Sequence, residues 1–192
     1  MRGFTIFTAR ERGFTLIELL VVIAILGVLA GAVLVAINPL EQLARGRDAG
    51  RRTTIQQLGG AVQAYYTNQG AVYPSQGTMW MTTGTEDGST GLQVAGELKI
   101  IPVNPGGTGY TRGCNTVNVE QENSSGGTGY CYQEDGVDAV VYAQAEATSS
   151  RTNAGCQGSE VVWIVWSSAE GKTGLVCKAA SDDPEPGETG LK

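Results

Sequence analysis

Apolar side chains follow one another without a charged residue from Leu19 to Ile37, a run of 19 positions. A helix of that length rises about 28 Å, which is enough to cross the hydrocarbon part of a bilayer. After Pro39 the apolar residues fall in two groups, Leu40 and Leu43 and then Ile55, Leu58, Val62 and Tyr65, with steps of three or four positions within each group. That period predicts an amphipathic helix with one packed face, and the Asn-Gln-Gly sequence at 68–70 predicts its end.

The last third of the chain has short β-branched and aromatic runs separated by turn residues. They predict strands over 129–133, 139–145, 161–166 and 174–177. The segment 75–129, dense in Gly, Thr and Ser, predicts turns with short extended pieces at 78–82, 92–101 and 116–120. Its two GGTGY copies, at 106–110 and 126–130, lack the Lys-Ser or Lys-Thr of a phosphate-binding loop. We therefore expect an α+β protein, in which the C-terminal half of a long N-terminal helix packs on a small antiparallel sheet.

Composition restricts the chemistry. The net charge is −6, which argues against nucleic acid as the main partner. The chain has no histidine, so Ser-His-Asp and Cys-His catalysis and His-ligated metals are excluded. Neither a metal-ligand pattern nor a nucleophile elbow is present, and we expect a protein that is not an enzyme and has no resident cofactor.

All four cysteines lie beyond the apolar run, with spacings of 17, 25 and 21 residues and no C-x-x-C. This favours disulfides in an oxidising compartment over zinc or thioredoxin-like chemistry. Three pairings are consistent with the sequence. The two that close short local loops, Cys114–Cys131 and Cys156–Cys177, are favoured, and free thiols are the alternative.

Basic residues precede the apolar run: Arg2, Arg10 and Arg12 stand against the single acid Glu11. The positive-inside rule predicts a cytoplasmic N-terminus and an exported C-terminal part. A cleavable secretory signal would have a shorter apolar region and an A-x-A-like site. A plain signal anchor fits the length and charge but leaves Glu18, at the start of the run, without a role, although a carboxylate in hydrocarbon is costly.

The stretch Gly13-Phe14-Thr15-Leu16-Ile17-Glu18 resembles the processing signature of type IV prepilins and type II secretion pseudopilins. The resemblance implies a prepilin peptidase that cuts after Gly13 and then methylates the new N-terminal Phe14. It also implies a role for Glu18 in assembly, through a charge pair with the Phe14 amine of a neighbouring subunit. A pair with the amine of its own Phe14 is the alternative.

The same resemblance implies a structural subunit of a helical homopolymer. The precursor would be a single-pass protein of the inner membrane with its head outside, and the product a cell-surface filament assembled by an ATPase and membrane platform proteins. A type IV pilus is favoured, with a type II secretion pseudopilin as the alternative and a signal-anchored extracellular binding module as the rival class. The chain departs from many pilins at Val35, where they have proline, whereas its own proline is Pro39.

The expected organisation has five parts. They are a leader at 1–13, a transmembrane or filament-core helix at 14–38, an amphipathic helix at 39–70, an exported β-rich head at 71–180 and an acidic flexible tail at 181–192. Trp163 and Trp166 are predicted on opposite sides of a strand, one in the core and the other on a contact surface.

Two groups of charged residues have more than one interpretation. The first is Arg45, Arg47, Asp48, Arg51 and Arg52. We expect a solvated helix face there, with intersubunit ion pairs and then DNA contact as alternatives. The second consists of two acidic clusters, Asp182, Asp183 and Glu185 in the tail and Glu134, Asp135 and Asp138 in a turn. We expect both to be solvated, and the alternative is that one of them supplies oxygen ligands to calcium.

Overall fold

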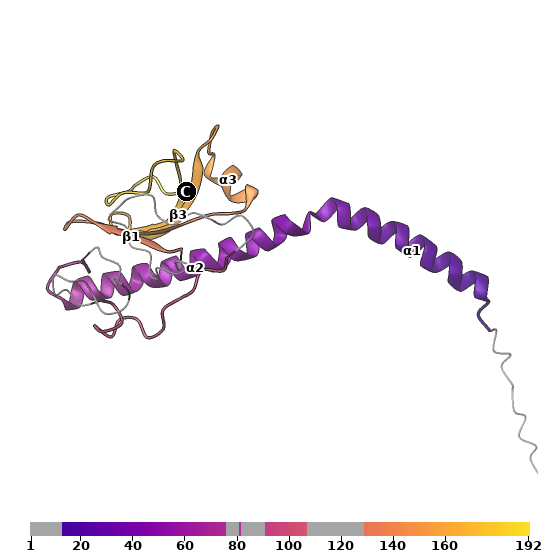
Figure 1. Cartoon of the computed structure of the whole chain (residues 1–192), viewed down its shortest axis with the longest axis horizontal. Helices are drawn as coiled ribbons and strands as arrows, with labels where there is room; N and C mark the ends of the chain where they lie inside the picture. Colours follow the sequence, from indigo (N-terminus) through magenta and orange to yellow (C-terminus); the bar gives the residue numbers. More distant parts are fainter. Residues whose placement is uncertain (1–12, 76–80, 82–90, 107–128) are drawn as a thin grey trace, which may run out of the picture. The chain divides into compact units, whose positions relative to one another are not determined.

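The computed structural model describes residues 13–75, 81, 91–106 and 129–192 (Figure 1). The chain divides into two compact units, Met1–Pro39 and Leu40–Lys192. Each unit is described by itself. The second unit is called the head below.

The first unit contains the helix α1, Leu16–Ile37. Its aliphatic residues continue to a sharp end at Asn38, which adopts the left-handed conformation with φ 45°. Asparagine tolerates this conformation better than other residues with a side chain. Pro39 then opens the next helix, a position that suits proline because the first N–H of a helix has no intrahelical partner. The expected interruption at Pro39 is therefore a helix end followed by a new start.

The head consists of one long helix, a four-stranded antiparallel sheet and a short helix. The elements in chain order are α2 (Pro39–Asn68), β1 (Cys131–Glu134), β2 (Ala139–Gln144), α3 (Thr148–Ala154), β3 (Val161–Ser167) and β4 (Lys172–Lys178). The strands lie in the order β1-β2-β3-β4, each paired with the next. The α+β class and all four strands are as predicted. Helix α3 was not predicted, and residues 92–101 form turns where an extended piece was expected.

One face of the sheet packs on α2. The core between them includes Ile55, Leu58 and Val62 from the helix and Ile164 and Trp166 from β3. Helix and sheet come close at Gly59, where a Cβ atom would lie 2.3 Å from the Trp166 ring. Only glycine fits under the indole at this position.

The other face of the sheet is also covered. Tyr142, Trp163 and Val165 point to this side, are at most 1% exposed and pack with Leu191 from the end of the chain. The expectation that one of the two tryptophans forms a contact surface is wrong, because Trp163 and Trp166 are both buried.

The C-terminal segment covers part of this second face, as the yellow trace above the sheet shows (Figure 1). Lys192 exchanges two backbone hydrogen bonds with Leu175 of β4, at 2.8 and 3.1 Å. The Tyr142 hydroxyl donates to Asp183, which is buried. The tail was expected to be flexible, and the structure differs because its apolar and backbone groups have partners on the sheet.

Candidate functional site

The carboxylate of Glu18 lies in the first turn of α1 and forms a capping box with Thr15. Its Oε2 accepts hydrogen bonds from the Thr15 backbone N–H at 2.9 Å and from the Thr15 hydroxyl at 2.7 Å. In return the Glu18 N–H donates to the Thr15 hydroxyl oxygen at 3.3 Å. Two of the N–H groups that a helix start leaves without partners are satisfied in this way.

The capping box gives Glu18 a local role that the sequence interpretation overlooked, although the Thr-x-x-Glu pattern is its known signature. Both hydrogen bonds to the carboxylate end on Oε2, and Oε1 has no hydrogen-bond partner among the described residues. The cap therefore fixes the position of the carboxylate at the helix start and keeps one oxygen open. Phe14, the predicted new N-terminus, lies just before the cap and is 80% exposed.

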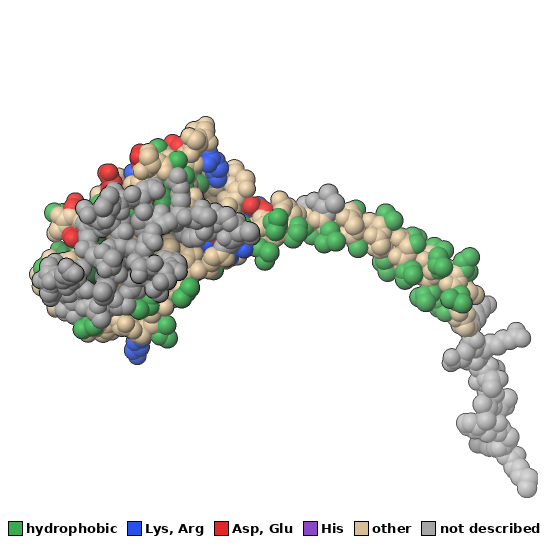
Figure 2. Space-filling view, viewed as in Figure 1, with side chains coloured by type: hydrophobic (Ala, Val, Ile, Leu, Met, Phe, Trp, Pro, Cys, Tyr) green, Lys and Arg blue, Asp and Glu red, His purple; other side chains and the backbone are tan. Residues whose placement is uncertain are grey.

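Apart from Glu18, helix α1 carries no charged residue, and apolar side chains line the face that Figure 2 shows (green). The described large apolar side chains of the helix range from 45% exposed at Val22 to 86% at Leu16. Leu16–Leu34 is long and apolar enough to cross a membrane. An isolated apolar helix of this kind is stable only when lipid or other protein covers it.

In the head, a buried ion network joins α2 to the segment before α3. The guanidinium of Arg51 has no exposed surface and donates to Asp48 Oδ1 at 2.8 Å and to Asn104 Oδ1 at 2.6 Å. It also donates to the Pro105 carbonyl at 2.7 Å and forms an ion pair with Glu146. A buried cation is tolerated only with such a full set of acceptors.

The N-terminus of α3 is capped by carboxylates from α2. Asp48 accepts the backbone N–H groups of Glu146 and Ala147, each at 2.9 Å. Glu41 accepts those of Thr148 and Ser149, each at 3.0 Å. The bond from the Ser149 N–H, followed by that from Thr148, lowers the pKa of the Glu41 carboxyl to about 2. The N-cap residue of α3 is Ala147, whose side chain cannot accept a hydrogen bond. The carboxylates of α2 therefore supply the acceptors for the N–H groups at the start of α3.

These contacts correct the interpretation of the charged residues at 45–52 as a solvated face. Asp48 and Arg51 are buried, and Arg47 pairs with Glu146 at 2.6 Å. Apart from the pair between Asp48 and Arg51, the partners lie about 50 to 100 positions further along the chain, so no local pattern around residue 50 could reveal them. Arg45 and Arg52 remain exposed.

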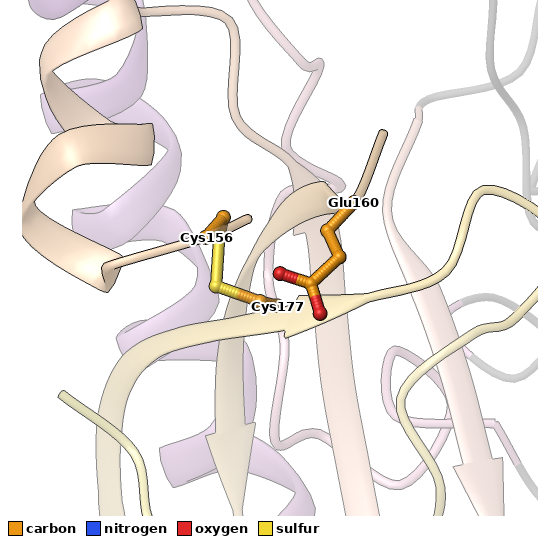
Figure 3. A group of neighbouring side chains, drawn as sticks. All are labelled: Cys156, Glu160 and Cys177. Atoms are coloured by element: carbon orange, nitrogen blue, oxygen red, sulfur yellow. A yellow bond between two sulfur atoms is a disulfide. The ribbon is translucent and has the colours of Figure 1, made fainter. Parts of the chain in front are cut away.

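One of the favoured disulfides is present in the described part of the head. Cys156 and Cys177 are bonded, with their Cα atoms 5.4 Å apart, and the bond joins the segment after α3 to β4 (Figure 3). Cys131 is also disulfide-bonded. Its expected partner, Cys114, lies outside the described residues, so that pairing stays a prediction.

Figure 3 shows the Glu160 carboxylate beside this disulfide, the one group of three ligand-type side chains that converges among the described residues. Metals bind thiolates, and here both sulfurs are used in the cross-link. The acidic clusters at 134–138 and 182–185 do not bring three carboxylates together within 4.8 Å.

Residues 8–34 match the family model of the prokaryotic N-terminal methylation motif. The match covers Gly13, Phe14, Glu18 and most of α1. No curated protein and no solved structure matches the chain. The motif implies processing by a prepilin peptidase and assembly into pilus-like filaments, and α1 fits a membrane-anchored precursor. By this motif the chain carries the N-terminal signature of the type IV prepilins and type II secretion pseudopilins.

Proposed function

We propose that the chain is the structural subunit of a type IV pilus-like surface filament, cut after Gly13, methylated on Phe14 and polymerised through α1. The observation that carries this proposal is the apolar surface of α1, whose described large apolar side chains are each at least 45% exposed. Lipid covers this surface in the precursor. Other copies of α1 cover it in the filament, so monomer and polymer share one helix.

Glu18 makes the transfer of α1 from lipid into the filament core selective. Moving α1 from lipid into a protein core replaces one apolar environment by another, so burial alone favours neither strongly. Before cleavage the nitrogen of Phe14 belongs to a peptide bond and has no charge, whereas afterwards it is a cationic amine. The open Oε1 of Glu18 is then available to the Phe14 amine of a neighbouring subunit, and a close pair in low dielectric is strongly favoured over two unpaired charges.

The partners in this proposal are further copies of the chain, a prepilin peptidase that also methylates, an assembly ATPase and membrane platform proteins. The role is structural, with no reaction catalysed by the chain itself. The absence of histidine from the sequence supports this, since it removes the commonest general base.

The capping box and the charge pair can be separated by two substitutions. Glu18→Gln keeps a side chain that can complete the box but removes the charge, whereas Thr15→Val removes the hydroxyl and keeps the charge. Each variant is expressed with an equal amount of unsubstituted chain, and the subunit ratio in sheared filaments is measured by mass spectrometry. We expect Glu18→Gln to be under-represented at least about tenfold, which corresponds to about 1.4 kcal/mol, and Thr15→Val to be far less affected. Equal incorporation of Glu18→Gln would remove the assigned role.

A secretion pseudopilus is the second candidate, favoured by Val35 at the position where many pilins have proline. The covered faces of the sheet and the Cys156–Cys177 cross-link support an exposed pilus, because both stabilise a head that meets the outside medium. Deletion of the gene discriminates between the two. Loss of surface filaments with normal protein secretion supports the pilus, and retention of secreted proteins behind the outer envelope would support the pseudopilus.

A further inference from the structure

A surface pocket of about 410 Å³ lies between α2 and α3 of the head. Ile164 and Leu175, both buried, line its base from β3 and β4. Arg45 and Arg52 of α2 and Lys192 lie at its exposed rim. Arg45 and Arg52 are seven positions apart and thus share one face of the helix. The pocket combines an apolar base with a cationic rim.

The positive charge of this rim is only partly neutralised. Arg45 bonds Glu41 at 3.1 Å, but Glu41 also accepts two N–H groups of α3. The Lys192 ammonium donates to the Ala154 carbonyl at 2.7 Å. Arg52, which is exposed, has no ion pair or hydrogen bond within the described part of the chain. The one acid lining the pocket, Asp48, is used by Arg51 and by the N-terminus of α3. The rim therefore suits an anionic group brought from outside.

The turn between β1 and β2 complements this pocket in charge and in polarity. It runs from Glu134 to Asp138 and carries three acids around Val137, whose side chain is 75% exposed. Asp135 Oδ1 accepts the N–H groups of Val137 and Asp138 at 2.9 and 2.8 Å, which holds the turn in one conformation. The same two bonds, that from Asp138 first, lower the pKa of Asp135 and keep it ionised. The result is a preorganised tip with one apolar side chain among carboxylates.

The turn of a subunit cannot reach the pocket of the same subunit. Strand β2 separates the turn from the segment that leads into α3, and its six residues span about 20 Å. In Figure 1 the turn beside β1 and the helix α3 lie at opposite ends of the head. A tip at one end and a matching pocket at the other define a head-to-tail contact, and such contacts generate open helical assemblies when they do not close into rings.

We propose that the Glu134–Asp138 turn of one subunit docks into the pocket between α2 and α3 of another copy of this chain, with Val137 on the apolar base and the carboxylates at the cationic rim. This contact rests on the proposed function, since it joins neighbouring heads in the filament. It supplies an orientation for the heads that the uniform apolar surface of α1 does not provide.

Cross-linking in intact filaments tests the contact. The full-length chain carries Val137→Cys at the tip and Ala49→Cys in the pocket, and mild oxidation on the cell is followed by non-reducing electrophoresis. We expect a ladder of covalent multimers from the double variant and none from either single variant. The matched control replaces Val137→Cys by Val94→Cys, an exposed valine outside the turn (61%), and should give no ladder.

A charge exchange provides the second measurement. Val137→Lys brings a cation to the apolar base of the pocket, next to the cationic rim, and we expect the fraction of sheared filaments that survives a salt wash to fall at least about fivefold. Adding Arg52→Glu to the same chain should restore it, which a merely structural effect of either change would not do. Filaments that begin at Phe14 but give no ladder and no restoration would overturn the docking contact alone. If the unsubstituted chain forms no filaments, the proposed function itself is overturned, and the contact with it.

Discussion

Arg51 offers the sharpest test of how the head is held together. Its guanidinium bonds Asp48, Glu146, Asn104 and the Pro105 carbonyl, and its side chain has no exposed surface. Arg51→Met keeps much of the apolar stem but removes the charge. Asp48, 7% exposed, then loses its cation, and Glu146, 12% exposed, keeps only Arg47. Removing one partner of a buried ion pair costs about 3–5 kcal/mol.

The assay is urea unfolding of the detergent-solubilised full-length protein, followed by tryptophan fluorescence. Trp163 and Trp166 are both buried in the head and report its unfolding. With a urea m-value of about 2 kcal/mol/M, the midpoint of Arg51→Met should fall by about 1.5–2.5 M. The matched control is Arg52→Met, at the next position of the same helix but exposed, which should change stability by less than about 0.5 kcal/mol. A loss below about 1 kcal/mol for Arg51→Met, or equal losses for both variants, would refute the buried network as a major source of stability.

Three further predictions concern the head. Gly59→Ala should lower the free energy of unfolding by about 1–3 kcal/mol, because the new Cβ would collide with the Trp166 indole of β3. Gly60→Ala, with open space around it, should raise the free energy of unfolding by up to about 1 kcal/mol. Equal effects of the two variants in urea unfolding would contradict the close packing at Gly59. Replacing Cys156 and Cys177 together by alanine should lower the free energy of unfolding by about 3 kcal/mol, because the disulfide joins residues 21 positions apart. An unchanged melting temperature would show that the bond does not form. The lowered pKa of Glu41 means that its stabilising contribution is fully present above the ordinary value of 4.5 and is lost as the pH falls through about 2. The melting-temperature difference between the native chain and Glu41→Gln should therefore shrink over that range, and a difference independent of pH would rule out the contribution of the ionised carboxylate.

Local patterns were sufficient to predict the main elements. The uninterrupted apolar run predicted α1, the three-to-four spacing predicted α2, and the β-branched runs predicted the four strands, because each of these signals lies within a few residues. The roles of Gly13, Phe14 and Glu18 were inferred from the resemblance to a family signature, which is continuous in sequence, and these roles stay predictions. The capping box was equally local and could have been found from Thr15 and Glu18.

Features that depend on distant residues were not predictable from the sequence. Helix α3 is short and polar, and its N-terminus is capped by Glu41 and Asp48 from α2. The burial of Arg51 depends on acceptors from two other segments. The position of the tail on the sheet depends on β4 and Tyr142, whereas its acidic, proline-rich composition favoured a flexible segment. In each case the partner lies far along the chain, where periodicity carries no information.

The central claim is that this chain is cut after Gly13 and polymerises with Phe14 at its N-terminus. Peptide mass spectrometry on filaments sheared from the cell surface tests it most directly. We expect a fragment that begins at Nα-methylated Phe14 and no fragment from the leader. Protein found only in membranes, with residues 1–13 still attached, would contradict the account and leave a simple membrane anchor.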